Sequence, residues 1–337
     1  MTRIANIMAG ARHGGAEAFY ERLTIALHGA GEEVLAVIRR DEERAARLAA
    51  GGVAPLQLGF GGPLDILTRP RIGLALKRFQ PRVAVVWMNR AASKTPEGPW
   101  PLVGRLGGYY DLRYYRFCDH LVGNTRDLRD WIVSQGCPPE RAHYLPNFAA
   151  DFAGVTPAGL PGQSPRLLAM GRLHRNKGFD TLIRALALVP DATLCIAGEG
   201  PERAALQALA EECGVAGRVH LLGWRQDTGA LLAGCDVFVC SSRHEPLGNI
   251  VLEAWSASRP VVSTAAQGPS ELIEPDETGL LVPVEDPEAL AGGIRRLLAE
   301  PQAAARLAQL GRARFERDFA EGPVLASWRE FLHKVER

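Results

Sequence analysis

Short apolar runs alternate with longer segments of helical spacing along most of this chain. The runs, rich in Val, Ile and Leu, include residues 34–38, 83–87, 121–123, 167–170, 193–197, 219–222, 237–240 and 261–263. Segments with helical spacing lie between them, among them residues 16–27, 125–135, 179–188 and 202–213. This alternation is typical of parallel sheets with helices on both faces, where strands are apolar along their whole length. The sequence therefore predicts an α/β protein built on doubly wound sheets.

The chain is long enough for two domains, and its composition marks one boundary. It has 337 residues, and domains usually hold roughly 100–200. The stretch 149–165 contains three glycines and three prolines with few large apolar residues, which is typical of a linker. We therefore expect two Rossmann-like domains, residues 1–150 and 165–320, facing each other across a cleft. A last helical segment, within residues 321–337, is expected to return to the first domain.

Composition excludes several functional classes. The formal net charge is +1 and 23% of residues are charged, so no general positive field recruits nucleic acid. The six cysteines form no CxxC pair and no zinc spacing, so no metal site is expected. The N-terminus lacks a signal-type apolar stretch, and no run approaches the roughly 20 apolar residues of a membrane span. These features favour a cytoplasmic protein.

The first candidate motif is the glycine-rich stretch 10–17, directly after the first expected strand. Gly14 and Gly15 allow close approach of the backbone to a ligand, and the following helix presents free N–H groups. This geometry suits a phosphate or a sugar hydroxyl. The alternative is an ordinary tight turn between strand and helix, and the stretch does not match the GxGxxG dinucleotide pattern.

The second motif, residues 171–180, places cations between an expected strand and a helix. Arg172 offers a planar fork to phosphate oxygens, and Lys177 offers a point charge. It is not a Walker loop, because neither Ser nor Thr follows Lys177. The alternative is a solvated charged loop.

The third motif, residues 241–254, contains two carboxylates eight positions apart. Glu245 falls in the loop after an expected strand, and Glu253 about one turn into the next helix, which should begin near Gly248. The amides expected to be open to an anion at this helix start are those of Gly248, Asn249, Ile250 and Val251. One carboxylate on each side of an anion site fits a nucleoside diphosphate sugar. A capping or surface role is the alternative for such a pair taken alone.

Two weaker motifs follow neighbouring strands. Gly200 belongs to the loop 198–203, a degenerate relative of the dinucleotide loop with Arg203 at its third glycine position. Gly223 and Trp224 follow the next strand, where the indole could bound a base pocket or be an ordinary half-buried aromatic.

Taken in order, these motifs resemble the retaining group 1 glycosyltransferases, which include lipopolysaccharide-core and phosphatidylinositol mannosyltransferases and sucrose synthases. The resemblance covers nearly the whole chain. Glu245-x7-Glu253 looks like the family's paired-glutamate motif, and the stretch from Arg172 to Lys177 like its diphosphate-binding stretch. The stretch 14–17 resembles the family's glycine-rich loop, and residues 145–148 its domain-closing strand. The resemblance implies the GT-B fold.

The resemblance also implies roles for the site residues. Arg172 and Lys177 would hold the donor diphosphate, Glu253 the ribose, and Glu245 the transferred sugar. The implied reaction moves a hexose-type sugar from a UDP- or GDP-linked donor to a glycan or lipid-linked acceptor, with retention of configuration and no cofactor. No DxD sequence occurs, so a metal-independent mechanism is expected, in lipopolysaccharide or other envelope polysaccharide synthesis.

One position departs from the family pattern. A glycine, Gly107, stands where members often have a histidine near the sugar. His13 and His120 are possible substitutes, although His120 is expected at the start of a strand.

Other functions stay open at this point. A nucleotide-sugar epimerase or hydrolase of the same fold is the first alternative. An NAD(P)-dependent oxidoreductase is another, with Arg39 and Arg40 placed to suit a 2′-phosphate. A catalytically silent carbohydrate-binding protein is the third.

The segment 69–82 combines basic residues with Ile72, Leu74, Leu76 and Phe79. Such a segment suits docking on an anionic membrane, at the inner face of the cell membrane. The alternative is a helix that packs on the sheet and exposes a solvated basic face.

Overall fold

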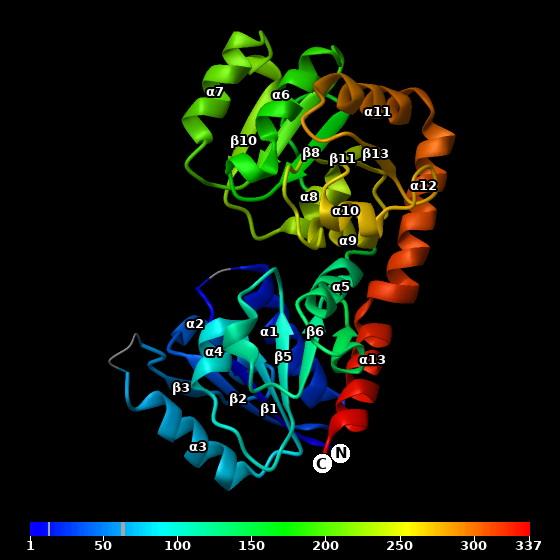
Figure 1. Cartoon of the computed structure of the whole chain (residues 1–337). Coiled ribbons are helices and arrows are strands. Elements are labelled where there is room, and N and C mark those ends of the chain that lie inside the picture. The colour runs from blue at the N-terminus through cyan, green and yellow to red at the C-terminus, as the bar shows by residue number, and fades with distance from the viewer. Residues whose placement is uncertain (13, 62–64) are drawn as a thin grey trace. The chain divides into compact units, whose positions relative to one another are not determined.

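A computed structural model describes residues 1–12, 14–61 and 65–337 of the chain. The chain divides into two units, residues 1–148 with 321–337, and residues 149–320. Each unit holds one parallel sheet (Figure 1). We call them unit 1 and unit 2.

Unit 1 contains a seven-stranded parallel sheet in the order β3-β2-β1-β4-β5-β6-β7. Its strands are β1 (Arg3–Met8), β2 (Glu33–Arg39), β3 (Leu56–Leu58), β4 (Val83–Trp87), β5 (Leu102–Leu106), β6 (His120–Gly123) and β7 (Ala142–Tyr144). Its helices are α1 (Gly15–Gly29), α2 (Glu42–Ala50), α3 (Thr68–Phe79), α4 (Met88–Lys94), α5 (Arg126–Ser134) and α13 (Glu321–Val335), with the 3-10 turns η1 (Leu112–Tyr115) and η2 (Pro139–Arg141). The chain order reverses between β1 and β4, as in Rossmann sheets.

Alternating residues of β1 divide the core of unit 1 into two layers. Ile4 and Met8 pack with the apolar faces of α1, α2 and α13, whereas Ala5 and Ile7 pack with those of α3, α4 and α5. Since successive side chains of a strand point to opposite faces, this alternation shows a sheet covered on both sides.

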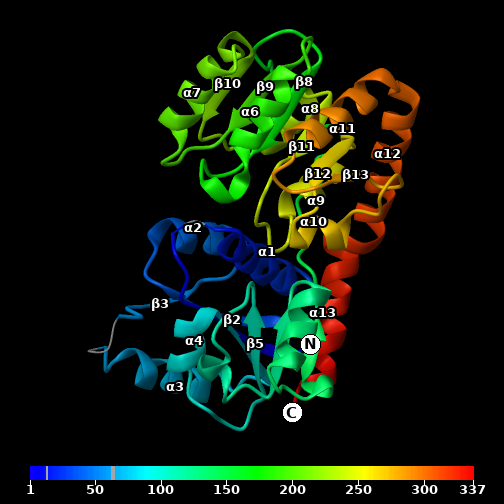
Figure 2. The ribbon, with the colours of Figure 1, turned by 45° about the horizontal axis from the view of Figure 1, so that its top comes forward.

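The C-terminal helix α13 belongs to unit 1 and packs beside α1 (Figure 2). Its Trp328 is fully buried and stacks on Trp87 of β4, with ring centroids 6.3 Å apart. Arg329 Nε donates a hydrogen bond of 2.8 Å to the buried carboxylate of Glu32. The last residues of the chain therefore complete a core whose strands lie far away in sequence.

Unit 2 contains a six-stranded parallel sheet in the order β10-β9-β8-β11-β12-β13, so its switch point lies between β8 and β11. Its strands are β8 (Arg166–Met170), β9 (Thr193–Ala197), β10 (Val219–Gly223), β11 (Val237–Cys240), β12 (Val261–Thr264) and β13 (Leu280–Val282). Its helices are α6 (Phe179–Ala187), α7 (Arg203–Glu212), α8 (Thr228–Gly234), α9 (Asn249–Ser256), α10 (Gln267–Leu272), α11 (Pro287–Ala299) and α12 (Pro301–Arg314), with the short turns η3 (Arg175–Lys177), η4 (Ala216–Arg218) and η5 (Phe315–Phe319).

The predicted fold class is confirmed, since both sheets are parallel and doubly wound. The apolar runs identified in the sequence all fall on strands. The prediction of a strand over residues 145–148 is wrong. Strand β7 ends at Tyr144, and the segment beyond it has no regular structure. The Leu145 amide still donates to Gly123 O at 3.0 Å, but Pro146 has no N–H to continue the ladder.

Helix α3 corrects part of the expectation for segment 69–82. Ile72 and Leu76 are fully buried in the core, so they form no external apolar face. Leu74 is 51% exposed, and Ile66 and Leu67, just before the helix, are 78% and 56% exposed. Among the described helices, none is long and apolar enough to cross a membrane.

Gly178 is held in a left-handed conformation (φ 61°) at a close backbone contact. A Cβ atom there would lie 2.0 Å from Ser241 O, at the end of β11. Gly214, after α7, has a similar φ of 70° but open space around it.

We predict that Gly178→Ala destabilises unit 2 more than Gly214→Ala. Both variants incur roughly 1–2 kcal/mol for an L-residue in left-handed backbone. Gly178→Ala must also displace the β11 loop, at a further cost of about 1–3 kcal/mol. Urea unfolding of both variants measures the difference, and equal losses would contradict this close packing.

His120 and His143 form a partly buried pair on β6 and β7 beneath Phe331 of α13. His120 Nδ1 and His143 Nε2 are 3.1 Å apart, and the His143 and Phe331 ring centroids are 4.7 Å apart. Burial, reinforced by the neighbouring His120 and Lys334, lowers the pKa of His143 to about 4. Burial also lowers the pKa of His120.

We predict that unit 1 loses stability as the pH falls from 6.5, the ordinary histidine pKa, toward about 4. In this window the unfolded chain binds protons that the folded state excludes, whereas above it both states are neutral. Denaturant midpoints measured against pH should show this slope. His143→Gln should flatten it, and the exposed His28→Gln should not. Identical slopes for wild type and His143→Gln would refute the prediction.

Candidate functional site

The candidate site lies at the carboxyl end of the unit 2 sheet, where β8 and β11 are neighbours. This adjacency brings the loop after β8, residues 171–178, against the loop after β11, residues 241–248. Ser241 Oγ donates to Lys177 O at 2.9 Å, and Asn176 O accepts from the amides of Arg243 and His244 at 2.8 and 3.2 Å. Two motifs about 70 residues apart in sequence thus form one surface.

Lys177 and Glu245, predicted separately from the two loops, form an ion pair through Nζ and Oε2. Their side chains are 24% and 13% exposed. Ser242 Oγ also lies 3.4 Å from Glu245 Oε2. The pair is shielded enough for a substantial interaction and open enough for a ligand to reach it.

Arg172 is exposed on the same loop. Within the described residues its guanidinium makes no ion pair or hydrogen bond. The loop therefore holds one cation engaged by a carboxylate and one available to an external anion. A guanidinium in this position suits bidentate recognition of phosphate oxygens.

Helix α9 starts where the sequence predicted. Gly248 precedes it in a left-handed conformation (φ 78°), and Glu253 is its fifth residue and is partly buried. The expectation of four open amides is wrong for one of them, because Val251 N already donates to Gly248 O at 2.8 Å. The amides of Gly248, Asn249 and Ile250 precede this first helical hydrogen bond.

The two weaker motifs join the same sheet edge. Gly198 N donates to Gly223 O at 2.8 Å, and Leu173 N donates to Glu199 O at 2.9 Å. A Cβ atom on Gly200 would lie 2.3 Å from Leu173 O, so this position requires glycine for backbone contact. Trp224 is 66% exposed, rather than half-buried.

Arg243 fixes the two main loops together, a role that the sequence did not reveal. Its guanidinium donates to both Asp180 oxygens at 2.7 Å, to Glu285 Oε1 at 2.5 Å and to Arg175 O at 2.9 Å. Partial burial opposes the ionisation of Asp180, but the hydrogen bonds from Arg243 outweigh it and lower the pKa of that carboxyl. The pKa of Arg243 is raised, chiefly by its hydrogen bonds to Asp180. Both charges therefore persist and hold the loops in register.

The glycine-rich loop belongs to unit 1, whereas the motifs described above belong to unit 2. Gly14 caps α1 and Gly15 is its first residue. The buried Glu17 turns back so that its Oε1 accepts from Ala11 N at 2.7 Å. A Cβ atom on Gly10 would lie 2.4 Å from the same carboxylate. Because a carboxylate already occupies this loop, it favours a sugar hydroxyl over a phosphate.

A buried arginine lies beside the position where the family often has histidine. Gly107 follows β5, and a Cβ atom there would be 2.7 Å from Arg105 Nη1. Arg105 is 1% exposed, donates to Asn147 Oδ1, and has its pKa lowered by burial to about 10. His120 begins β6, as predicted, which places it at the opposite end of the sheet. His13 lies outside the described residues.

Known proteins resemble this chain in sequence over nearly its full length. The family model "Glycosyl transferases group 1" matches residues 156–314. The lipopolysaccharide core biosynthesis glycosyltransferase LpsE of Rhizobium meliloti is 35% identical over 334 residues, covering 95% of this chain and 96% of the relative. LpsD of the same organism is 32% identical over 333 residues, with 95% of each chain covered.

Solved structures show the same fold. HepE of Anabaena, crystallised with UDP, superposes with a TM-score of 0.84 at 20% identity, covering 98% of this chain and all of HepE. Its complex with UDP-glucose gives 0.84 at 21% identity, with 99% and 100% coverage. On this combined evidence the chain belongs to the group 1 glycosyl transferases and has their GT-B fold.

Proposed function

We propose that this protein transfers a hexose-type sugar from a UDP- or GDP-linked donor to a glycan or lipid-linked acceptor of the cell envelope. Unit 2 would bind the donor and unit 1 the acceptor. The lipopolysaccharide core relatives support the envelope acceptor, and the UDP-glucose complex of HepE supports the donor class. We further propose that transfer retains the anomeric configuration and needs no metal or cofactor.

The Lys177–Glu245 ion pair carries this proposal. It joins a cation suited to a diphosphate and a carboxylate suited to sugar hydroxyls at one point of the sheet edge. A bound donor would extend from Glu253, for the ribose, past Arg172 and Lys177 to Glu245. Its anomeric C–O bond would then lie between the cations and the sugar-facing carboxylate.

The reaction consists of one exchange at the anomeric carbon. A bond forms from the acceptor hydroxyl oxygen, the bond to the diphosphate breaks, and the hydroxyl proton passes to the leaving phosphate oxygen. Arg172, Lys177 and the amides at the start of α9 would stabilise the charge that develops on the diphosphate. Fixed donors of this kind need little reorganisation during reaction.

One prediction of this proposal concerns the four donor residues. Arg172→Ala and Lys177→Ala should lower kcat roughly a hundred- to thousandfold, the usual cost of losing one transition-state donor. Glu253→Ala should mainly raise the donor KM, because the ribose does not change during reaction. Glu245→Ala should lower kcat while affinity for the free nucleoside diphosphate stays nearly intact. Transfer assays and calorimetry with UDP and GDP measure these effects.

Arg175→Ala is the matched control, because its exposed side chain lies on the same loop and only its carbonyl contacts Arg243. Full activity in all four variants would refute the site. Loss of nucleotide binding in Glu245→Ala, with normal binding in Glu253→Ala, would refute the assigned roles. A nucleotide sugar consumed without any acceptor product would indicate an epimerase or hydrolase instead.

Another prediction concerns membrane contact at the inner face of the cell membrane. We propose that the exposed Ile66, Leu67 and Leu74 insert beside Arg69 and Arg71 of α3. Vesicles rich in phosphatidylglycerol should bind the protein more tightly than neutral vesicles. Each basic residue should contribute about 1 kcal/mol.

Co-sedimentation of Arg69→Gln, Arg71→Gln and Leu74→Ser variants tests this contact. Arg306→Gln, an exposed change on α12, is the control. Binding that ignores lipid charge and salt would refute membrane docking.

A further inference from the structure

Unit 1 contains a cavity of about 680 Å³ at the carboxyl ends of its strands. Its walls come from the residues after β1, the end of β2, helix α4 and the loop after β5. All of them belong to unit 1. Ligands of doubly wound sheets bind at this edge, near the switch point between β1 and β4.

Positive charge distinguishes this cavity. Of the described residues that line it, Arg39, Arg90 and Lys94 are cationic and none is acidic. Arg90 Nη1 donates to Phe60 O at 3.2 Å, and Lys94 Nζ donates to Asp65 O at 2.9 Å. These acceptors are neutral carbonyls, which position the cations without cancelling their charge.

Two carboxylates lie close to the lining, and both are engaged by backbone amides: Glu17 Oε1 accepts from Ala11 N at 2.7 Å, and Asp65 follows the lining residue Gly61 in the sequence. Asp65 Oδ2 accepts from Gly61 N at 2.7 Å, and Oδ1 accepts from Thr68 N at 3.1 Å. Hydrogen bonding to Thr68 is the main reason that the pKa of Asp65 falls to about 2, and the charge of Lys94 adds to it. Asp65 thus stays ionised and shapes the loop, but within the described residues it makes no ion pair with the cavity cations.

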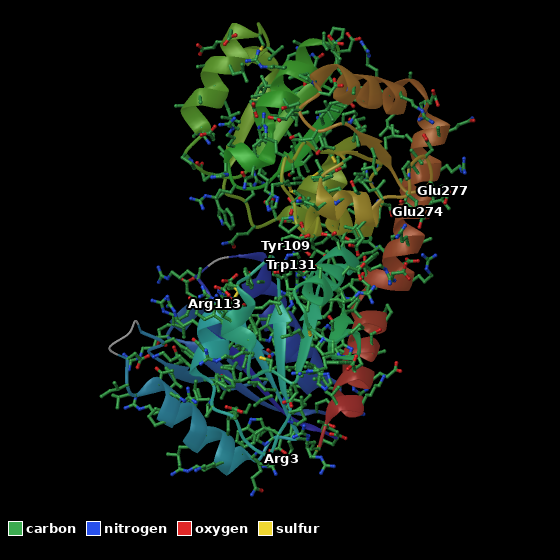
Figure 3. The ribbon with its side chains drawn as sticks, in the orientation of Figure 1. Arg3, Tyr109, Arg113, Trp131, Glu274 and Glu277 are labelled. Carbon is green, nitrogen blue, oxygen red and sulfur yellow. The ribbon has the colours of Figure 1, made fainter. Side chains whose placement is uncertain are left out.

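A second hollow of about 410 Å³ adjoins the first through Ser93 and Tyr114. Its described lining adds Arg69, Arg113 and Arg116, of which Arg113 pairs with Asp111 at 2.6 Å. Arg113 lies on η1, which packs on α4, whereas Arg3 marks the opposite end of the sheet (Figure 3). The two hollows therefore form one basic trough.

Aromatic and polar groups in the trough suit a sugar chain. Tyr114 and Phe117 are 45% and 42% exposed. The Arg116 guanidinium lies over one face of the Phe117 ring, 4.6 Å from its centroid, and the exposed ring surface suits sugar C–H groups. Asn89 lines the first cavity, and its buried Oδ1 has no hydrogen-bond partner in the described structure. Met88, also in the lining, has a φ of 69°, which is costly for a non-glycine residue and typical of functional sites.

The charge of the whole unit matches the trough. Unit 1 has 23 Lys and Arg against 17 Asp and Glu, a formal charge of +6. Unit 2 has 16 against 21, a charge of −5. The net charge of +1 is therefore the sum of a positive charge on unit 1 and a negative charge on unit 2.

We propose that this trough binds an acidic acceptor glycan, one whose sugars carry carboxylate or phosphate groups next to the accepting hydroxyl. The proposal rests on the proposed function and adds the charge class of the acceptor. Arg39, Arg90 and Lys94 contact the anionic groups, and Tyr114 and Phe117 contact the sugar rings. This assigns Arg39, whose side chain could instead have suited a 2′-phosphate, to acceptor binding.

The test uses the full chain and the core oligosaccharide that accumulates in a strain lacking this gene. One sample stays native; in the other, carboxyl groups are reduced to alcohols and phosphates removed with phosphatase. Removing the charges should raise the acceptor KM at least tenfold with the donor KM unchanged. Arg39→Gln, Arg90→Gln and Lys94→Gln should each raise the KM for the native acceptor about tenfold, the usual effect of losing a charged hydrogen bond. They should change it little for the neutral acceptor.

Lys77→Gln and Arg78→Gln, exposed in the last turn of α3 and outside both hollows, are matched controls for surface charge. Equal KM values for the native and neutralised acceptors would overturn the inference while leaving the proposed function intact. Transfer to neither acceptor would contradict the proposed function and the inference together. If the cavity variants instead lost binding to phosphatidylglycerol vesicles without any change in acceptor KM, the trough would be a lipid site.

Discussion

The candidate site of unit 2 depends on the backbone contact between the loops after β8 and β11. Gly178 can lie against Ser241 only because it has no side chain and accepts a left-handed conformation. Once the loops are this close, Asn176 O accepts two amides and Lys177 reaches Glu245. The chemistry attributed to two separate motifs is therefore a consequence of one main-chain contact at the sheet's switch point.

Charge pairing then fixes the side chains that the backbone brings together. All three guanidinium nitrogens of Arg243 donate hydrogen bonds, to Asp180, to Glu285 and to a carbonyl of the neighbouring loop. Arg172, by contrast, has no such engagement in the described structure. One arginine positions the loops and the other is left for a ligand, although both are equally charged in the sequence. The two arginines differ because the fold places carboxylates beside Arg243 and none in contact with Arg172 among the described residues.

Most central strands and the loop motifs could be predicted from the sequence, because each is encoded locally; the central strand β5 (Leu102–Leu106) was missed, since Gly104 and Arg105 interrupt its apolar pattern. A strand buried on both faces is a continuous apolar run, as in residues 83–87 and 237–240. Three-residue edge strands such as Leu56–Leu58, Ala142–Tyr144 and Leu280–Val282 carry too little pattern to be recognised. The partners of Arg243 could not be predicted, since they lie 42 to 68 residues away and meet it only through the strand order. The contact of Glu17 with the glycine-rich loop, by contrast, depends on local spacing, because Glu17 lies only six residues after Ala11. That contact could in principle have been predicted from the sequence.

The opposite formal charges of the two units bear on how the protein could bind two anionic substrates, the proposed nucleotide-sugar donor and the proposed acidic acceptor. Unit 2 is acidic overall, so the proposed diphosphate would be attracted only where Arg172, Lys177 and the start of α9 create a local positive field. Screening over about 8–10 Å in cellular salt limits the repulsion from the remaining carboxylates. Unit 1 differs, because six of its cations line the two hollows: Arg39, Arg69, Arg90, Lys94, Arg113 and Arg116. Under the proposed function, a donor would therefore be selected by a few close contacts, whereas an acidic acceptor would be favoured by the field of a whole trough. Affinity for the acceptor should accordingly depend on salt more strongly than affinity for the donor, because salt screens a long-range field more than it screens close contacts.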